Sequence, residues 1–339
     1  MRRRGATLLV GAIVLMLLVF ASFEGVTVPY VALTPGPTWN TLGTDHNKDV
    51  IQISGGDVST SKGQLRMVTV GVQDHITLWE AIQGWLSGDD AVVPREVIYP
   101  PDESQQQVDQ ENQKEFASSQ NAAITAALRE LGYPVKVVVK DVPAGSPSTG
   151  KLQKGDQLST VDGQPVTSGQ KLTTLIRGKP VGSTLTIGYR RDGAAGTTTV
   201  STVAGQDKTP RVGIQIDEEQ PNPYKITISL DNVVGPSAGL MFSLGIIDKL
   251  KPQDLTSGIA VAGTGTIDGD GNVGAIGGIP QKMRGARRDG ATVFLAPAAN
   301  CKEAVANAVP GLKLVKVGTL AEALSALQTL GNGGTPPLC

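Results

Sequence analysis

Histidine, cysteine and aromatic residues are scarce in this sequence. Its 339 residues include two His, two Cys and only 4% Phe, Trp and Tyr. Such a small supply of ligands excludes zinc fingers, iron–sulfur clusters and any His-rich metal site. The 30 basic residues are balanced by 31 acidic ones, so the chain lacks the basic footprint of a nucleic-acid-binding protein. We therefore expect no metal, no cofactor and no nucleic acid.

Apolar residues, in contrast, are plentiful. They make up 40% of the chain, which is enough for a folded core and too much for a disordered protein. The 42 Gly and 21 Pro indicate many turns. At roughly 100–200 residues per domain, the length predicts two or three domains.

The N-terminus has the pattern of a membrane anchor. Arg2, Arg3 and Arg4 precede an apolar run over 6–23. As a helix, about 18 residues span roughly 27 Å, close to the hydrocarbon thickness of a bilayer. The alternative is a cleaved signal peptide, but its apolar region is usually shorter and "VFASFEG" is a poor cleavage site. We expect 1–25 to be an uncleaved single-pass transmembrane helix in the cell membrane, with the arginines in the cytoplasm and the C-terminal domains extracytoplasmic.

Residues 26–127 have mostly β-type patterns. "GQLRMVTVGV" alternates like a strand, whereas "TLWEAIQGWL" (77–86) predicts a short amphipathic helix with Leu78, Ile82 and Trp85 on one face. A Gln-rich stretch near 100–120 reads as an exposed loop or helical arm and becomes helical towards Leu131. We expect 26–127 to pack with a later α/β domain.

Short strands and turns fill 128–205, with one helix predicted at 169–176. The stretch "AGSPSTGKLQKGDQLSTVDGQPV" and the later "GSTLTIGYRRDG" resemble a PDZ domain, with Gly155-Asp156 opening a strand and Asp162-Gly163 closing a hairpin. The resemblance implies a β-rich domain that binds a peptide as an added strand. The alternative is a domain that only spaces or regulates its neighbour.

Residues 206–331 alternate strand-like and helix-like runs, as in an α/β domain, and 332–339 form a turn-rich tail.

Three motifs in the chain match known sites but lack their context. "GSPSTGK" (145–151) is followed by Leu152 where a phosphate loop needs Ser or Thr. "GDGNVG" (269–274) and "DGDGN" (268–272) lack the helix of a dinucleotide site and the Glu of a calcium loop. We interpret this Gly-rich stretch as a hairpin turn.

A fourth motif, "GPSAG" at 235–239, fits the G-x-S-x-G nucleophile pattern. A Ser-His-Asp hydrolase of the α/β type places its His after the Ser, but His46 and His75 both precede Ser237. A buried lysine can replace histidine as the base, because desolvation lowers its pKa. The lysines after Ser237 are Lys249, Lys251, Lys282, Lys302, Lys313 and Lys316. Lys282 follows a Gly-rich turn at a helix start and is the best placed of them.

"VVGPSAGLMFSLGIIDKL" followed by "GTGTIDGDGNVGAIGGIPQKMRGARRDGATVFLAP" resembles the proteolytic domain of Lon proteases. The resemblance implies a Ser-Lys dyad of Ser237 and Lys282, which are 282 − 237 = 45 positions apart. It also implies an oxyanion-binding region around Pro236, Ser237 and Ala238. Thr264 or Thr266 is a candidate helper, because Lon proteases often carry a Thr near the dyad.

As a whole, the chain is similar to the membrane-anchored, PDZ-containing Lon-like serine proteases of bacteria. We expect an α/β (α+β) Lon-type proteolytic domain with an inserted PDZ-like domain. The expected function is ATP-independent endopeptidase activity on exported or membrane proteins, since the chain carries no ATPase motif. The alternative function is a non-enzymatic scaffold that captures chain ends, with Ser237 only capping a helix. For the assembly, the resemblance to Lon rings implies a homo-oligomer.

Cys301 and Cys339 are the two cysteines of the chain. In an extracytoplasmic, oxidising compartment they can pair without conflict. We predict a Cys301–Cys339 disulfide that ties the C-terminal tail to the domain.

Overall fold

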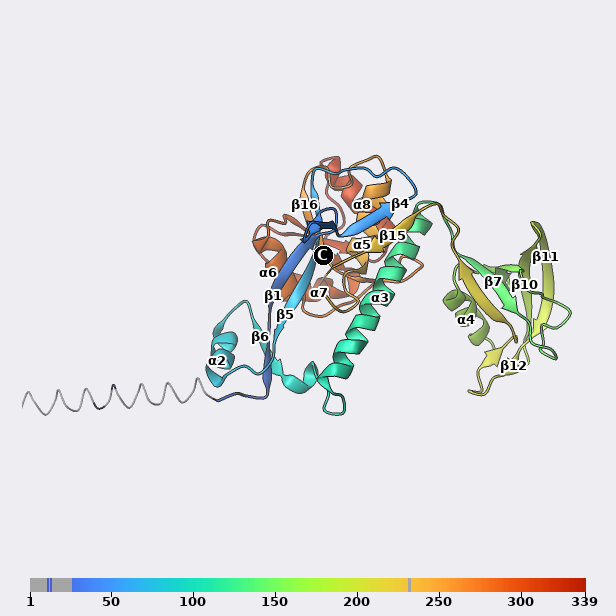
Figure 1. The fold of residues 1–339 in the computed structure, drawn as a ribbon, viewed down its shortest axis with the longest axis horizontal. Coiled ribbons are helices and arrows are strands. Elements are labelled where there is room, and N and C mark those ends of the chain that lie inside the picture. Colours follow the sequence, from blue (N-terminus) through green and yellow to red (C-terminus); the bar gives the residue numbers. More distant parts are fainter. Residues whose placement is uncertain (1–10, 12, 14–25, 231–232) are drawn as a thin grey trace, which may run out of the picture.

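The computed structural model describes residues 11, 13, 26–230 and 233–339. The predicted membrane helix at 1–25 lies almost entirely outside these residues. No helix within the described ranges is long and apolar enough to cross a membrane. The described chain forms a large body, 26–131 with 220–339, and a small body, 136–219 (Figure 1).

The large body contains the N-terminal and C-terminal parts of the chain. Its first elements are β1 (Tyr30–Asn40), β2 (Thr44–Asp45), β3 (Lys48–Asp49), β4 (Ile51–Ser54), β5 (Gln64–Gln73), α2 (Leu78–Leu86), β6 (Ala91–Pro94), the 3-10 helix η1 (Arg95–Val97) and α3 (Gln105–Glu130). After the small body come β15 (Lys225–Ile228), α5 (Gly239–Leu250), β16 (Ala260–Gly263), β17 (Thr266–Ile267), β18 (Val273–Gly274), α6 (Ile279–Arg288), β19 (Val293–Pro297), η2 (Ala298–Asn300), α7 (Cys301–Ala306), β20 (Lys313–Val317) and α8 (Leu320–Gly331).

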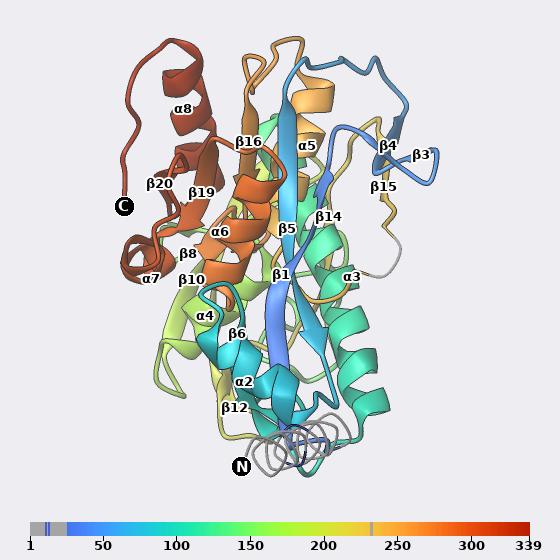
Figure 2. The ribbon, with the colours of Figure 1, turned by 90° about the vertical axis from the view of Figure 1, so that its left-hand side faces the viewer.

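One mixed sheet forms the centre of the large body, in the strand order β20-β19-β16-β5-β1-β6. The neighbours from β20 to β5 are parallel, and β5, β1 and β6 are antiparallel. Three strands from 26–127 thus share a sheet with three from the C-terminal part. Two helical layers cover it: α3, α5 and α8 contribute to the core on one face, and α6 and α7 to the core on the other (Figure 2).

Strand residues alternate between these two cores because successive side chains point to opposite faces. Val261 and Leu295 pack with α5, whereas their neighbours Ala262 and Phe294 pack with α6. A sheet that is covered on both faces is typical of parallel strands joined by helices. The fold of this body is therefore of the predicted α/β type.

The small body is a sheet with one helix of nine residues. Its elements are β7 (Lys136–Asp141), β8 (Gln157–Val161), β9 (Gln164–Pro165), α4 (Gly169–Arg177), β10 (Thr184–Arg191), β11 (Ala194–Ser201), β12 (Val203–Ala204), β13 (Pro210–Arg211) and β14 (Gln215–Glu219). The sheet order is β11-β10-β8-β7-β14, with β9 beside β8. The boundary placed at 205 from the sequence therefore falls short of the end of this sheet, because β14 returns to pair with β7.

Local sequence signals explain the helices that were predicted. Thr77 and Glu80 form a reciprocal capping box at the start of α2, which begins at Leu78. The helix predicted at 169–176 is α4, capped by Ser168. The Gln-rich stretch is the helical arm rather than the loop: α3 runs through it for 26 residues. From Phe116 onward it packs against the core that contains α5, with the rings of Phe116 and Phe242 6.0 Å apart.

Candidate active site

Ser237 lies in the turn that leads into α5. Gly235 has a φ of +85°, a left-handed conformation that glycine adopts without strain, and its N–H donates to the carbonyl of Asn112 over 3.1 Å. The N-cap residue of α5 is Ala238, and no side chain caps the helix. Ser237 is therefore not a capping serine. Within the described residues its hydroxyl has no hydrogen-bond partner, which leaves it available for chemistry.

Two neighbouring segments hold the carbonyl groups of this turn. The carbonyl oxygen of Ser237 accepts from the Gly265 N–H at 2.9 Å and from Thr264 Oγ1 at 3.0 Å. The carbonyl of Pro236 accepts from Ser119 Oγ at 2.9 Å. The backbone of the turn is thus fixed by α3 on one side and by the loop after β16 on the other.

Lys282 lies in the first turn of α6, and its side chain is directed into the protein. The residue is only 4% exposed, and its Nζ donates to Thr264 Oγ1 over 3.4 Å. Burial lowers the pKa of Lys282 from 10.5 to about 8. No carboxylate among the described residues forms an ion pair with it, so the neutral amine becomes the major form above about pH 8.

The backbone that positions Lys282 depends on one glycine. Gly278 precedes α6 with a φ of +71°, and its carbonyl accepts from the Lys282 N–H at 3.0 Å. A Cβ on Gly278 would lie 2.5 Å from Cγ2 of Val70 on β5. The Gly-rich turn noted in the sequence before Lys282 therefore brings α6 close to the sheet, and Lys282 with it.

Thr264 is the residue that connects the two halves of the candidate dyad. Its hydroxyl donates to the Ser237 carbonyl and accepts from Lys282 Nζ, and the residue is fully buried. Thr266, the other helper candidate, instead pairs with Gly274 in the β17–β18 hairpin. The sequence could not decide between the two threonines. Ser119 was also not predicted from the sequence. Its only signal there is that it is a small polar residue on the inner face of a helix.

The two histidines are not part of this site. His46 and His75 are turn residues with positive φ, and their side chains are 77% and 70% exposed. Each lies beside the aspartate that precedes it in the chain. In the described structure neither contacts Ser237 or Lys282, so the arrangement differs from a conventional triad.

The oxyanion region predicted at 236–238 contains two usable donors. Pro236 has no N–H, whereas the N–H groups of Ser237 and Ala238 have no backbone acceptor among the described residues. Both lie at the N-terminal end of α5, where the helix dipole favours negative charge. This turn can therefore donate to a developing oxyanion.

A cavity of about 230 Å³ opens beside the turn. Its walls come from α3, from Pro236 and from the hairpin, and they consist of Glu115, Ser118, Ser119, Ala122, Pro236, Thr266 and Ile267. The cavity is large enough for one amino-acid side chain. One of its walls is Pro236, the residue that precedes Ser237 in the chain.

Two family models match the chain. The description "PDZ domain" covers 106–202, and "Lon protease (S16) C-terminal proteolytic domain" covers 227–328. This protein joins a PDZ domain to a Lon-type proteolytic domain. The Lon-type match contains Ser237, Thr264 and Lys282. The PDZ match begins within α3, although the structure packs that helix against α5 of the Lon-type domain.

Curated Lon proteases are similar to about a third of this chain. Lon protease 2 of Bacillus subtilis is 29% identical over 111 residues, 32% of this chain and 20% of its own length. The archaeal Lon protease of Methanocaldococcus jannaschii is 30% identical over 133 residues, 39% of this chain and 20% of its own. The chain thus spans about a fifth of the length of these relatives.

Solved PDZ structures are similar to about a quarter of this chain. The PDZ domain of the SdrC-like protein Lmo2051 from Listeria monocytogenes is 27% identical, with 24% of this chain and 85% of that chain covered and a TM-score of 0.23. The corresponding domain of Lin2157 from Listeria innocua is 30% identical, with 24% and 92% covered and a TM-score of 0.23.

The PDZ domain has a groove between α4 and the segment that leads into β14. A cavity of about 320 Å³ lies there, lined by Pro143, Leu172, Thr173, Ile176, Arg177, Pro210, Arg211, Val212, Gly213, Ile214 and Ile216. Because β14 is the last strand of its sheet, its outer edge is open for pairing with another strand. Apolar walls and an open strand edge suit an extended peptide.

The two domains touch through a small polar cluster. Arg129 at the end of α3 pairs with Asp270 of the β17–β18 turn and donates to the Thr167 carbonyl at 2.6 Å. Ser168, the N-cap of α4, donates to Asp270 over 3.2 Å. The groove helix of the PDZ domain is therefore bonded to the hairpin that follows Thr264.

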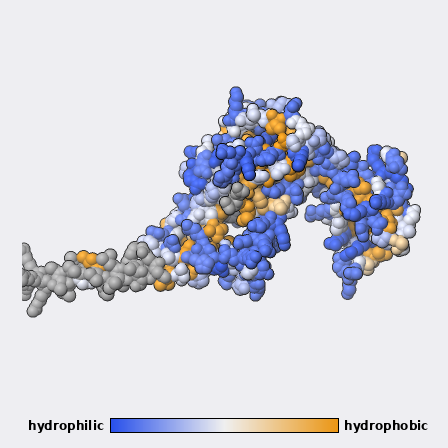
Figure 3. All heavy atoms as spheres, viewed as in Figure 1, coloured by the Kyte–Doolittle hydropathy of each residue, from blue (hydrophilic) through white to orange (hydrophobic). Residues whose placement is uncertain are grey.

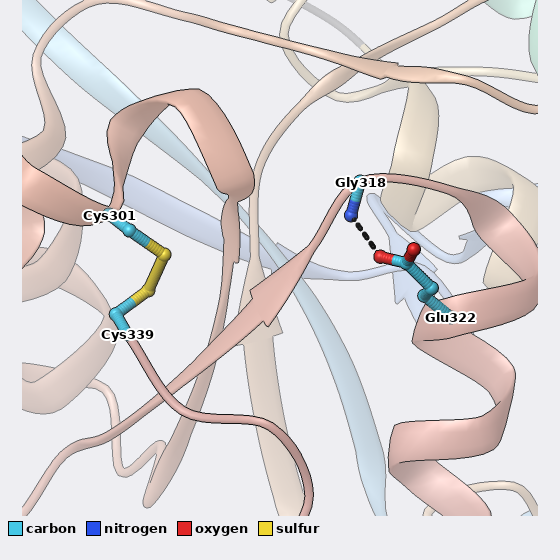
Figure 4. The surroundings of a disulfide bond; sticks show 4 residues. All are labelled: Cys301, Gly318, Glu322 and Cys339. Atoms are coloured by element: carbon cyan, nitrogen blue, oxygen red, sulfur yellow. Dashed lines mark hydrogen bonds between the residues drawn. A yellow bond between two sulfur atoms is a disulfide. The ribbon is translucent and has the colours of Figure 1, made fainter.

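Cys301 and Cys339 form a disulfide (Figure 4). The tail also lies along β20: the Lys316 N–H donates to the Pro337 carbonyl at 3.0 Å, and the Cys339 N–H to the Leu314 carbonyl at 3.1 Å. The bond thus closes a tail that the sheet edge already holds.

Proposed function

We propose that this protein is a membrane-anchored, ATP-independent serine endopeptidase that cleaves exported or membrane proteins with a Ser237-Lys282 dyad. The observation that carries the proposal is the buried, unpaired Lys282, whose Nζ contacts the same Thr264 hydroxyl that binds the Ser237 carbonyl. A lysine with no structural counter-ion is costly to bury, and a catalytic base is the use that such a group serves best.

In the proposed mechanism, neutral Lys282 accepts the proton of the Ser237 hydroxyl as the oxygen attacks the peptide carbonyl. The Ser237 and Ala238 N–H groups donate to the resulting oxyanion. Lys282 then returns the proton to the leaving amine, and the C–N bond breaks to give an acyl-enzyme. A water molecule hydrolyses the ester, with Lys282 again as the base. Thr264 orients the amine throughout.

The substrate-binding part of the proposal rests on the two cavities. The groove beside β14 takes an extended peptide by strand addition, and the cavity beside Pro236 takes a side chain close to the scissile bond. The membrane anchor and the extracytoplasmic location rest on the sequence of 1–25. ATP independence rests on the absence of an ATPase motif from the sequence: the phosphate-loop-like 145–151 is followed by Leu152 and lies in a turn of the PDZ domain.

The test is a Ser237→Ala variant, measured on a disordered protein substrate and with a serine-directed phosphonate. Activity should fall by several orders of magnitude, as in other enzymes that lose their nucleophile, on the order of 10⁶-fold. Its stability should change by less than about 0.5 kcal/mol, because the hydroxyl has no protein partner. The control is Ser201→Ala, on an exposed edge of the PDZ domain. Wild-type protein that is inert to both substrate and phosphonate would favour the scaffold.

A further inference from the structure

Helix α2 carries apolar side chains on both of its faces. Its inner face is small: Ala81 and Gly84 are buried, and a Cβ on Gly84 would lie 2.4 Å from Val92 of β6. Of the apolar residues predicted from the sequence to share a face, Leu78 and Ile82 are partly buried and only Trp85 is exposed. Trp85 is 56% exposed and the adjacent Leu86 is 83% exposed. The helix therefore presents large apolar groups to the outside.

Two further apolar side chains extend this surface. Val26 is 51% exposed and Val97, in η1, is 64% exposed. Tyr30 begins β1 opposite Pro94 and makes an edge-to-face contact with Trp85, with ring centroids 5.5 Å apart. We call Val26, Trp85, Leu86 and Val97 the α2 surface. Exposed apolar groups that cluster in this way commonly mark an interaction site.

The start of α2 is fixed directly to the chain that leaves the predicted anchor. The Leu78 N–H donates to the Val26 carbonyl at 2.9 Å, and Thr27 forms a β-bridge with Thr77. The apolar run ends at Phe23, three residues before Val26. Three residues span at most roughly 11 Å. Val26 and the start of α2 must therefore lie within that short distance of the end of the apolar run, and the rest of the α2 surface follows within the length of one short helix.

The chemistry of this end of the molecule suits a bilayer interface. Trp and Tyr are enriched where headgroups meet acyl chains, because one end of each ring system is apolar and the other polar. Figure 3 shows apolar residues at the end of the large body where α2 and β6 lie in Figure 1. Two of the nearby acidic residues are paired, Asp74 with Arg95 and Asp89 with Arg284, whereas Asp90 and Glu96 form no ion pair with a described residue. Helix α2 contains no basic residue that could attract anionic headgroups, so the contact with a bilayer would depend on its apolar side chains.

We infer that the α2 surface docks on the lipid bilayer, with Trp85 and Leu86 inserted at the interface. This inference rests on the membrane anchor of the proposed function. Docking gives the proteolytic domain a second membrane contact besides the anchor and so restricts its rotation over the bilayer. A second protein copy is a poorer occupant, because four side chains expose less than the roughly 800 Å² that each partner buries in a standard interface.

The experiment uses full-length protein in phosphatidylcholine vesicles, with or without bromine on the acyl chains near the headgroup. The chain has three tryptophans, so Trp39→Phe with Trp79→Phe leaves Trp85 as the only one. We expect its emission to shift to the blue on reconstitution and to be quenched by the brominated lipid. The matched control retains only Trp39, which packs on the main core near the other end of β1 and should not be quenched.

Flotation of the same samples separates the two proposals. Protein that does not float with the vesicles would contradict the anchor. Protein that floats but leaves Trp85 unquenched would overturn docking and leave the anchor intact. If the tryptophan variants do not fold, a dye on Leu86→Cys, with Val181→Cys in the PDZ domain as control, gives the same reading from two exposed positions. An equal response of the two dyes would also overturn docking.

Discussion

The side-chain nitrogen of Lys282 lies 3.4 Å from the hydroxyl oxygen of Thr264. The same hydroxyl donates to the Ser237 carbonyl, so one buried threonine contacts both members of the proposed dyad. This contact restricts the lysine side chain without supplying a negative charge. The amine is thereby positioned while its lowered pKa is preserved.

Replacing Thr264 by Val should separate positioning from packing, because the two side chains have nearly the same shape. The variant loses the acceptor for the Lys282 ammonium and one donor to the Ser237 carbonyl. We expect kcat to fall on the order of 10²-fold, as for a misplaced catalytic group, with little change in KM. The pKa of Lys282 should fall further, which moves the rise of the pH profile below about pH 8. Thr264→Ser keeps the hydroxyl and should retain the wild-type profile.

The activity of the wild-type protein should rise with pH. The base must be neutral, and burial places the pKa of Lys282 at about 8, so kcat/KM should increase tenfold per pH unit below that value and level off above it. Lys282→Arg should be inactive, because a guanidinium stays protonated throughout this range. Removing either exposed histidine should leave the profile unchanged. A profile that followed His46 or His75 would restore a triad.

A Lys282→Met variant provides the folding control for this series. Because the folded-state pKa lies below the unfolded value of 10.5, the unfolded chain binds more protons between about pH 8 and 10.5. Wild-type stability therefore increases with pH in that window and is penalised below it. By this linkage, Lys282→Met should be more stable than the wild type at pH 7, by up to about 3 kcal/mol. Chemical denaturation should show a smaller difference in unfolding free energy between the two proteins at pH 10.5 than at pH 7.

Blocking the PDZ groove should affect protein substrates more than small ones. Thr173 and Thr174 are exposed neighbours on α4 with the same side-chain bond to the carbonyl four residues earlier, but only Thr173 lines the groove. Thr173→Trp should slow the cleavage of a disordered protein and spare a fluorogenic peptide. Thr174→Trp should slow neither. Equal rates for both variants on protein substrates would make the domain a spacer.

Reduction of the Cys301–Cys339 bond should destabilise the C-terminal part of the Lon-type domain. The cysteines are 38 positions apart, and closing a loop of that size contributes up to about 4 kcal/mol in the chain-entropy model. A Cys301→Ser, Cys339→Ser double variant should unfold at a lower temperature, and a reductant should not lower it further. If the wild type melts at the same temperature with and without reductant, the hydrogen bonds between the tail and β20 stabilise the domain without the disulfide.

Local sequence patterns determined several parts of this protein. The Gly-Pro-Ser turn before an apolar helix, the Gly-rich turn before Lys282 and the hairpin at 266–274 all depend on residues a few positions apart. So do the starts of α2 and α4, where a capping Thr or Ser precedes the helix. Turn and cap geometries follow from short-range hydrogen bonds and allowed φ values, which the sequence states directly.

Long-range pairing was decided only in the tertiary structure. The partner of a strand is not encoded in the strand itself, so β14 pairing with β7, and β5 with β16, could not be predicted from alternation alone. That Thr264 rather than Thr266 contacts the Ser237 carbonyl and Lys282 follows from which residue faces α5 and α6 once these strands are in register. The exposure of Trp85 and Leu86 likewise follows only from the tertiary structure, because β6 packs on Gly84 and leaves these two side chains outside.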